Sequence, residues 1–431
     1  MEIERLYTAF LNATEISTDT RSLKKGALFF ALSGPNFDGN RFAEEALGKG
    51  AHQVVVDDPN TLPNHPKALL VENTLSALQQ LATHHREKRN IPIIGLTGSN
   101  GKTTTKELIR EVLQKKFTVL ATEGNHNNHI GVPLTLLQLT EQHQIGIIEM
   151  GANHINEIGN LCEIALPNWG YITNFGKAHL EGFGSEAGII QGKSELYTHL
   201  IQNQGQILIN GDDPKQLEQT KNYQVVQFGC GKNSDFKIEA LPGEGNHLEL
   251  KFRDYRFKSP LYGTYNLSNI AAAIAFGALF EVPLTDIQKA IAQYDSKNNR
   301  SQKLKIKGIQ LILDAYNANP SSMEVALRAF SKNQTKNNAV ILGDMMELGK
   351  QSEIEHHQVL TLCLELGFSH IYTLGSQFKK TPLIHPTIEK FEDLNSLFQA
   401  FKASPKKTDR ILIKGSRSMQ LERIIPFFES L

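Results

Sequence analysis

The chain has 431 residues, and its 45 acidic and 45 basic side chains leave no formal net charge. That balance argues against the broad basic surface of a protein that binds nucleic acid non-specifically, so no nucleic-acid partner is expected. The length exceeds what one hydrophobic core usually spans, which predicts two or three domains.

Cysteines and targeting signals indicate the compartment. The cysteines at 162, 230 and 363 lie far apart without metal-ligand spacing, as is typical of reduced thiols rather than of a disulfide framework. The N-terminus lacks the basic-then-apolar pattern of a signal peptide, and the longest apolar run, near 270–280, is too short to cross a bilayer. We therefore expect a cytoplasmic protein without membrane insertion.

The first predicted domain spans residues 1–85. It contains short strands at 27–32 and 53–56 with helical stretches between them, a pattern that favours a small α/β domain. The charged stretch 84–90, followed by Pro92, indicates a linker into the next domain.

The most informative segment follows this linker. An apolar run at 91–94 predicts a buried strand, and residues 102–113 have apolar side chains four apart, as in an amphipathic helix. Between them lies the loop Thr97-Gly98-Ser99-Asn100-Gly101-Lys102-Thr103-Thr104. Helix N-terminal N–H groups and a lysine bind phosphates, and the following threonine hydroxyl binds magnesium. The loop predicts a nucleoside triphosphate site, although two residues separate Gly98 from Gly101 where the strict motif has four.

Strands and helices alternate through the predicted second domain, residues 86–298. Apolar segments predict buried strands of a parallel sheet wrapped by helices, at 118–121, 145–150, 169–174 and 206–210. Ligands of such sheets bind beyond the carboxyl ends of the strands. Glu149 ends one strand, where its carboxylate can hold magnesium, and His179 follows the next strand. Both are therefore candidate catalytic residues. The amide-rich segment 124–134 suits contacts to a polar substrate.

Residues 299–431 are predicted to form a third domain, after a polar break at 295–301. Apolar strands alternate with helices, as in a smaller Rossmann-like, doubly wound domain, at 309–313, 339–342, 370–374 and 410–414. The polar segment 314–320 follows the first of these strands. Residues 414–417 close the domain with two cations beside a glycine, which suits an anion.

As a set, these motifs resemble the ATP-dependent Mur ligases of peptidoglycan synthesis. That family has a Thr-Gly-Ser/Thr-Asn-Gly-Lys-Thr/Ser loop, which matches 97–103 and accounts for the glycine spacing. Other family motifs match Glu149, Ala178-His179, Lys193, Asn266, Asn269, Arg300 and Asp314. Segments in all three domains resemble the member that adds D-alanyl-D-alanine, at 17–21, 37–40, 127–133, 149–154, 315–320 and 414–417. Tyr265 departs from the pattern, because many members have histidine there.

The resemblance implies a three-domain α/β amide ligase that joins D-alanyl-D-alanine to UDP-N-acetylmuramoyl-tripeptide through an acyl phosphate. These small molecules are the expected partners, ATP and two Mg²⁺ ions the expected cofactors, and a monomer the expected state. The implied catalytic residues are Lys102, Glu149, His179 and Lys193. By resemblance, Lys193 is carbamylated by carbon dioxide, and the implied metal site consists of Thr103, Glu149, His179 and the modified Lys193.

Two further sets of residues are implied by the same resemblance. ATP is expected to contact the loop, namely Thr97, Gly98, Ser99, Asn100, Gly101, Lys102, Thr103 and Thr104, and also Asn266, Asn269, Arg300 and Asp314. The other substrates are expected to contact Asp19, Thr20, Arg21, Asn127, Asn128, Asn317, Asn319, Lys414, Ser416 and Arg417.

Three other interpretations stay open at this point. A sister Mur ligase or a folylpolyglutamate synthase shares the chemistry but uses a different amine. A P-loop phosphotransferase or regulatory NTPase explains the loop and Glu149, but it gives no role to His179, Lys193 or the third domain. A catalytically inactive binding protein is the third, and the complete set of candidate ligands argues against it. The third residue of the tripeptide, lysine or diaminopimelate, is not encoded in any recognisable motif.

Overall fold

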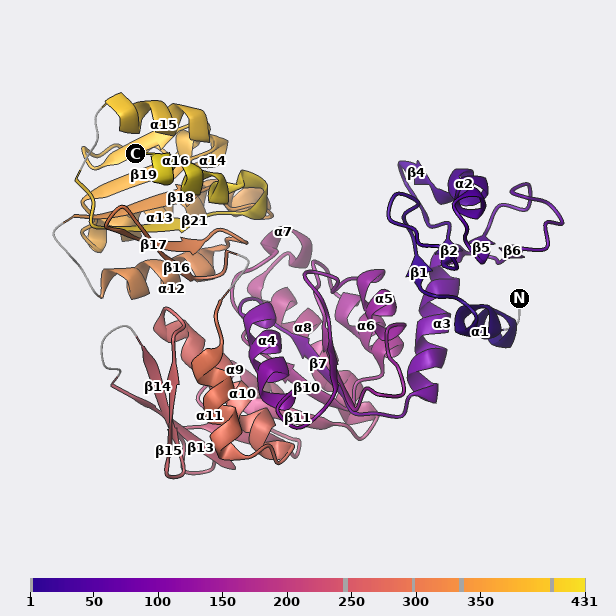
Figure 1. Ribbon diagram of the computed structural model, residues 1–431. Coiled ribbons are helices and arrows are strands. Elements are labelled where there is room, and N and C mark those ends of the chain that lie inside the picture. Colours follow the sequence, from indigo (N-terminus) through magenta and orange to yellow (C-terminus); the bar gives the residue numbers. More distant parts are fainter. Residues whose placement is uncertain (1–2, 243–246, 297–298, 333–336, 404–406, 431) are drawn as a thin grey trace.

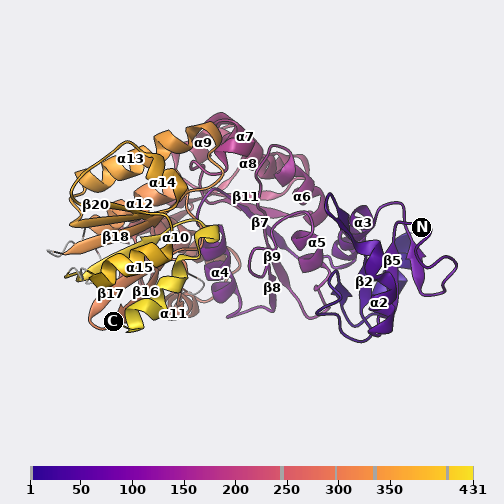
Figure 2. The same cartoon turned by 90° about the horizontal axis from the view of Figure 1, so that it is seen from above.

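The computed structural model describes residues 3–242, 247–296, 299–332, 337–403 and 407–430. These residues form three α/β units arranged as an open arc, with the N-terminal unit at one end and the C-terminal unit at the other (Figures 1 and 2). This arrangement confirms the predicted α/β fold class. The domain limits 1–85, 86–298 and 299–431 stay predictions, and residue 298 lies outside the described residues.

The N-terminal unit is built on a small parallel sheet. Its strands, in spatial order, are β1 (Ile16–Ser17), β2 (Leu28–Phe30), β5 (Gln53–Val56) and β6 (Ala68–Leu70). A hairpin of β3 (Ser33–Gly34) and β4 (Phe37–Asp38) lies beside it, with helices α1 (Ile3–Leu11), η1 (Gly39–Phe42) and α2 (Ala43–Gly48). Apolar strand residues of β2 and β5 are fully buried, which explains why alternating polarity is absent from their sequence.

Helix α3 (Thr74–Lys88) connects this unit to the next, and the predicted linker begins within its charged end. Asn73 caps its start by accepting a hydrogen bond from the Ser76 N–H. One face of the charged end is buried: His85 and Arg86 are 1% and 5% exposed. The Arg86 guanidinium donates to the carbonyls of Ala165, Leu166 and Arg89. The charges that indicated a linker therefore fasten α3 to the end of helix α6 (Glu157–Ala165).

The central unit contains a long sheet. Its strands, in spatial order, are β15 (Tyr255–Ser259), β14 (Leu248–Phe252), β13 (Phe236–Leu241), β12 (Val226–Gly229), β11 (Gln206–Asn210), β10 (Trp169–Ile172), β7 (Ile93–Thr97), β9 (Ile145–Glu149) and β8 (Val119–Ala121). Neighbours from β8 through to β13 are parallel, whereas β13, β14 and β15 form an antiparallel meander. The sequence analysis missed this meander because it predicted strands from continuous apolar runs, whereas these strands carry charged residues on one face.

Helices cover both faces of the central sheet. Successive strand residues point to opposite faces, so Ile93 and Ile94 belong to two different apolar cores. One core contains α4 (Lys102–Leu113), α10 (Leu267–Leu279) and α11 (Leu284–Gln293). The other contains α5 (Gly131–Leu136), α6 and α8 (Glu186–Gln202). The remaining helices of this unit are α7 (Leu180–Phe183), α9 (Pro214–Thr220) and η2 (Thr264–Asn266).

The strand order places a topological switch point between β7 and β10. From β7 the chain proceeds to β8 and β9 on one side, and then crosses to β10 on the other side. The loops that leave β7 and β10 therefore diverge and open a crevice at the carboxyl ends of the strands. The predicted phosphate loop and His179 follow these two strands.

The C-terminal unit is a second doubly wound sheet, as predicted. Its strands, in spatial order, are β16 (Gln302–Ile306), β17 (Ile309–Asp314), β21 (Arg410–Lys414), β18 (Asn338–Gly343), β19 (His370–Leu374) and β20 (Ile388–Phe391). One face packs on α12 (Pro320–Ser331) and α13 (Ser352–Glu365), and the other on α15 (Leu394–Ala403) and α16 (Ile425–Ser430). Shorter helices are η3 (Gly349–Gln351), α14 (Ser376–Lys380), η4 (Arg417–Met419) and η5 (Leu421–Ile424).

We predict that Arg86→Ala lowers the free energy of unfolding by about 2–3 kcal/mol, because it leaves carbonyls at the end of α6 without their charged donor. Urea unfolding followed by the fluorescence of Trp169, the single tryptophan, measures the change in the central sheet. Lys88→Ala, on the exposed side of the same helix, is the matched control. Equal unfolding midpoints for the two variants would show that α3 is not fastened through Arg86.

Candidate functional site

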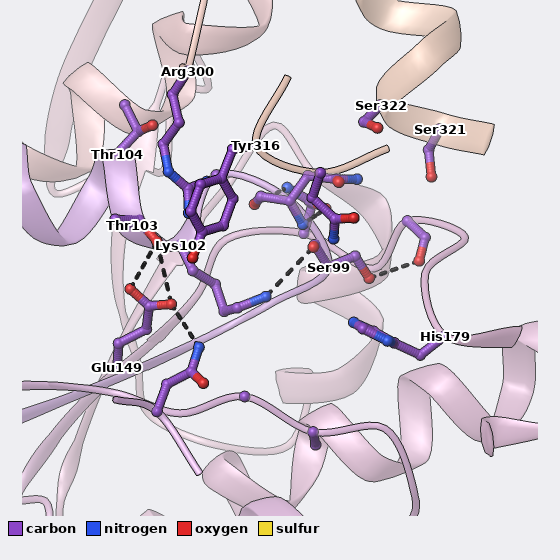
Figure 3. Close-up of a pocket in the computed structure, with 18 of the residues that line it drawn as sticks. Ser99, Lys102, Thr103, Thr104, Glu149, His179, Arg300, Tyr316, Ser321 and Ser322 are labelled. Carbon is purple, nitrogen blue, oxygen red and sulfur yellow. Dashed lines mark hydrogen bonds between the residues drawn. The ribbon is translucent and has the colours of Figure 1, made fainter. Parts of the chain in front are cut away.

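The phosphate loop links the end of β7 to the start of α4, where its N–H groups face a cavity (Figure 3). Gly98 has φ +141°, and a Cβ there would lie 2.0 Å from Thr173 Oγ1 on the neighbouring segment. Gly101 has φ +81°, and a Cβ would lie 2.8 Å from Asn269 Oδ1. Both positions therefore require glycine, for conformation and for space. This packing explains the glycine spacing of the motif.

Lys102 begins α4 and extends back along the loop. Its Nζ donates to the Gly98 carbonyl at 2.7 Å, and burial lowers the pKa of its ammonium group. The side chain thus lies across the loop whose N–H groups suit phosphate oxygens. A negatively charged ligand there would favour the protonated lysine.

A buried carboxylate, Glu149, occupies the end of β9. It accepts hydrogen bonds from the Thr103 hydroxyl at 3.0 Å and from the Asn127 amide at 2.9 Å. Lys106, one helical turn beyond Lys102, places its Nζ 3.5 Å from Glu149 Oε2. The side chains of Lys106 and Glu149 are 1% and 2% exposed, so this ion pair lies inside the protein. The pair neutralises a charge that would otherwise be costly to bury.

Asn269 supports the phosphate loop from behind. Its amide donates to Asn266 Oδ1 at 2.8 Å, and its Oδ1 accepts from the Thr105 hydroxyl at 3.0 Å. Asn266 in turn donates to the Tyr262 carbonyl at 2.7 Å. These amides hold α10 against the loop at Gly101, the position where no Cβ fits.

His179 lies at the start of α7, in the loop that follows β10. It adopts the left-handed conformation, with φ +55°, which is uncommon for a residue other than glycine. Its Nδ1 contacts the carboxylate of Glu347, which belongs to the C-terminal unit. This contact lowers the pKa of Glu347, chiefly through the hydrogen bond with His179. The same loop contacts the phosphate loop, because the Ser99 hydroxyl donates to the Gly176 carbonyl at 2.6 Å.

Lys193 is fully buried in α8. Its Nζ lies 5.2 Å from the centre of the Phe183 ring and has no hydrogen-bond partner among the described residues. Burial, reinforced by the positive charge of Lys102, holds the pKa of Lys193 well below its ordinary value. The protonated form of this amine is therefore disfavoured, and its hydrogen-bonding capacity is unsatisfied, which is unusual for a lysine.

The C-terminal unit contributes the loops that follow β17 and β21. The Arg300 guanidinium stacks 3.7 Å from the centre of the Tyr316 ring. Lys414 donates to Asp314 Oδ2 at 2.6 Å and to the Asn317 carbonyl at 3.2 Å. Because β17 and β21 are parallel neighbours, these side chains meet at the carboxyl edge of the second sheet. That edge faces the phosphate loop, and Asn319 donates to Asn100 Oδ1 across the interface at 2.8 Å.

A cavity of about 1070 Å³ lies between the central and C-terminal units. Most of the predicted site residues line it: Ser99, Asn100, Gly101, Lys102, Thr103, Thr104, Asn127, Asn128, Glu149, His179, Asn266, Asn269, Arg300, Asp314, Asn317, Lys414 and Arg417. Thr97, Gly98, Asn319 and Ser416 support its wall without lining it, and Lys193 lies buried in α8. Asp19, Thr20 and Arg21 lie in the N-terminal unit and do not line this cavity, and Arg21 there pairs with Asp19 at 2.6 Å.

The structure adds residues that the sequence analysis missed. Lys106 lies one turn after Lys102, so helical spacing could have placed it on the side of Glu149. Tyr316 was included only within a polar segment, and its stacking on Arg300 was not foreseen. Glu347 had no sequence signal, because its role depends on how two separate units meet.

The described residues contain no cluster of three or more His, Cys, Asp or Glu side chains that could hold a metal alone. A magnesium site here would therefore combine protein ligands with substrate oxygens, as is usual for this ion. In the same described part of the chain, no helix has both the length and the apolar character needed to cross a membrane.

A phosphate loop at a switch point, facing a second doubly wound unit across a polar cavity, defines an ATP-using α/β enzyme. Known family domains match along the chain: the catalytic domain of the Mur ligase family at 12–94, the Mur ligase middle domain at 96–277 and the Mur ligase glutamate ligase domain at 299–417. The chain belongs to the Mur ligase family, and it is an ATP-dependent ligase. The predicted family and enzyme class are confirmed.

Named relatives cover nearly the whole chain. The UDP-N-acetylmuramoyl-tripeptide–D-alanyl-D-alanine ligase of Bacillus subtilis is 36% identical, over 95% of this chain and 92% of its own. The crystal structure of MurF from Acinetobacter baumannii is 31% identical, with a TM-score of 0.87 over 100% of this chain and 98% of its own. MurF ligase from Thermotoga maritima, solved in complex with ADP, is 26% identical, with a TM-score of 0.85 over 98% of each chain.

We predict that Lys106→Met destabilises the central unit by about 3 kcal/mol, because it leaves the buried Glu149 carboxylate without its cation. Urea unfolding monitored at Trp169 measures the loss, and Lys115→Met, at an exposed position just beyond the same helix, is the control. Equal midpoints for both variants would mean that Thr103 and Asn127 suffice to satisfy the carboxylate.

Proposed function

We propose that this chain joins D-alanyl-D-alanine to UDP-N-acetylmuramoyl-tripeptide at the expense of ATP, giving the pentapeptide precursor of peptidoglycan. The observation that carries the proposal is the single cavity in which the phosphate loop, Glu149 and His179 face the cationic edge of the C-terminal unit. The relatives that bear this activity in their names span at least nine-tenths of the chain, which supports the choice of substrates.

The chemistry explains why such a cavity is needed. A carboxylate does not react with an amine, because oxide is a poor leaving group. In the proposed reaction a carboxylate oxygen of the tripeptide attacks the γ-phosphorus, ADP departs, and an acyl phosphate forms. The dipeptide amine then attacks the acyl carbon, and the tetrahedral intermediate expels inorganic phosphate. Three anionic groups must meet, so positive charge and N–H donors have to be concentrated in one place.

ATP binding is assigned first. In the proposal the N–H groups of 98–104 and the Lys102 ammonium hold the β- and γ-phosphates. Arg300, stacked on Tyr316 with its Nε unpaired and buried, contributes a second cation from the C-terminal side. Asp314 is assigned to the ribose, and Asn266 and Asn269 to the wall on the adenine side. The amide network of Asn269 supports a role in shaping the loop as well as in contact.

Thr103 and Glu149, at the carboxyl edge of the central sheet, fit a magnesium ion. Thr103 and Glu149 supply the hydroxyl and carboxylate oxygens that this ion prefers, and they lie 3.0 Å apart beside the phosphate loop. We assign a first ion to these two residues and a second to His179. Magnesium would supply charge neutralisation of the transferring phosphoryl group.

Lys193 fits a carbamate. A neutral, unpaired, buried amine is the form that reacts with carbon dioxide, and burial, which lowers the pKa of Lys193, favours that form. Adding carbon dioxide replaces the amine by an anion, which the nearby positive charge of Lys102 would favour. The carbamylated side chain would then complete the second metal site with His179.

The other substrates are assigned by position. Asp19, Thr20 and Arg21 are proposed to bind the uridine diphosphate end from the N-terminal unit, which forms one end of the arc (Figure 1). Asn127 and Asn128 would contact the peptide near Glu149. The dipeptide and phosphates would meet Asn317, Asn319, Lys414, Ser416 and Arg417. We further propose a monomer that works in the cytoplasm, since one chain supplies every assigned group.

The decisive assay measures phosphate release from ATP with UDP-N-acetylmuramoyl-tripeptide, with mass spectrometry of the product. We expect release only when D-alanyl-D-alanine is present, together with a pentapeptide product. Release with a single amino acid would instead identify a sister ligase. Release without any amine, or phosphate retained on a product, would identify a phosphotransferase.

We predict that Lys193→Met lowers turnover by ~100-fold, because an uncharged side chain cannot replace the carbamate near the metals. Carbon-13 NMR of protein incubated with labelled bicarbonate tests the modification directly. A carbamate signal is expected in the wild type and in the exposed-site control Lys221→Met, and not in Lys193→Met. Normal turnover in Lys193→Met, with no lysine-dependent signal, would remove the carbamate from the mechanism.

A further inference from the structure

The catalytic candidate His179 is oriented by a residue from another unit. Its Nδ1 pairs with the Glu347 carboxylate, and the Glu181 N–H donates to the Glu347 carbonyl at 3.2 Å. Glu347 therefore contacts the loop after β10 at two points, once through its side chain and once through its backbone carbonyl. Glu347 itself has φ +61°, an uncommon conformation that the surrounding structure must maintain.

We infer that Glu347 is a positioning residue for His179, and that docking of the C-terminal unit onto the central unit sets the histidine for catalysis. This inference rests on the proposed function, in which His179 binds the second magnesium ion. With Nδ1 facing a carboxylate, Nε2 is the ring nitrogen left to act as a ligand. Histidines that bind metals commonly direct their other nitrogen to a carboxylate, which fixes the tautomer and the ring orientation.

The segment that carries Glu347 is held rigidly by the C-terminal sheet. The Met345 N–H donates to His356 Nε2 at 3.0 Å, and the Met346 N–H donates to Ser416 Oγ at 3.1 Å. Just before them, Asp344 accepts hydrogen bonds from two N–H groups at the start of α14. The position of Glu347 is therefore determined by the C-terminal unit and not by the loop after β10, which it contacts.

Other contacts fasten the same loop to the same unit. Lys177 Nζ lies 3.2 Å from Glu355 Oε1 of α13, and the Ser321 hydroxyl donates to the Lys177 carbonyl at 3.4 Å. A Cβ at Gly176 would lie 2.7 Å from Ser321 Oγ. The loop 176–181 is thus one part of the surface on which the C-terminal unit docks, together with the contact between Asn319 and Asn100. Most of the phosphate loop's own contacts, by contrast, lie within the central unit.

This division predicts which step Glu347 affects. Glu347→Gln keeps the side-chain volume but removes the charge, so we expect kcat to fall by about 10- to 100-fold. The KM and Kd for ATP should stay unchanged, because Lys102 and the loop N–H groups do not contact Glu347. Glu347→Asp, which retains the charge on a shorter chain, should recover part of the lost kcat. Glu353→Gln, at an exposed site in α13, is the matched control and should behave as the wild type.

Two measurements separate positioning from a merely structural role. Hydrogen–deuterium exchange of peptides covering 176–183 should be faster in Glu347→Gln than in the wild type and Glu353→Gln, at an unchanged Tm. In a double-mutant cycle with His179→Asn, the losses in kcat should be far from additive, because both substitutions remove the same contact between His179 and Glu347.

The outcomes that overturn the inference are distinct. Unchanged kcat and unchanged exchange in Glu347→Gln would overturn it, as would losses that add fully to those of His179→Asn. A lowered Tm with uniformly faster exchange would overturn it by showing a structural role. Hydrogen–deuterium exchange is measured without substrates, so it tests the contact independently of the reaction. If the wild type fails to catalyse the proposed reaction but the variant shows faster exchange confined to 176–183, the proposed function is wrong. The positioning contact would still be supported.

Discussion

The structure depends on the close contact of two neighbouring parallel strands, β7 and β10, where the chain reverses its direction of progress through the sheet. Gly98 at the end of β7 lies so near Thr173 at the end of β10 that no side chain fits between them. The loops that continue from these strands are therefore neighbours although more than seventy positions separate them in the sequence. One is the predicted phosphate loop with Lys102, and the other carries His179. Sheet topology therefore makes the predicted phosphate loop and the candidate catalytic histidine neighbours.

Charge is the second constraint, and each buried charge is compensated differently. Glu149 has Lys106 beside it, with Nζ 3.5 Å from Oε2, and this counter-charge offsets the cost of burying the carboxylate. Lys193 has no hydrogen-bond partner among the described residues and lies near another lysine, and burial lowers its pKa. The two buried lysines therefore differ for a physical reason: Lys106 is the counter-charge of Glu149, whereas the protonated form of Lys193 is disfavoured.

Much of this could be predicted from the sequence, and the failures have identifiable causes. The apolar strands β9 and β18 are buried on both faces, and their periodicity and the motifs beyond them predicted both doubly wound sheets. The β13–β15 meander was missed because strands were predicted from continuous apolar runs, whereas these strands carry charged residues on one face. The charged end of helix α3 was interpreted as a linker, whereas Arg86 within it is buried against backbone carbonyls. In the site, residues of recognisable motifs were predicted in both units, including Arg300 and Lys414 of the C-terminal unit. Lys106 and Glu347 belong to no such motif and were missed, and the contact of Glu347 depends on how two units dock, which sequence spacing does not encode.

The central and C-terminal units contribute different parts of the candidate site. The phosphate loop, its supporting amides from Asn269 and the Lys106–Glu149 pair all lie within the central unit, so the nucleotide site is largely preformed there. Arg300 and Lys414 of the C-terminal unit line the cavity, and Glu347 of the same unit contacts His179, which also lines it. An acyl phosphate would be destroyed by water, so an enzyme gains by binding ATP in one unit and completing the reactive site with another. The contact between His179 and Glu347 serves both needs, because it joins the loop after β10 in the central unit to the C-terminal unit on the other side of the cavity.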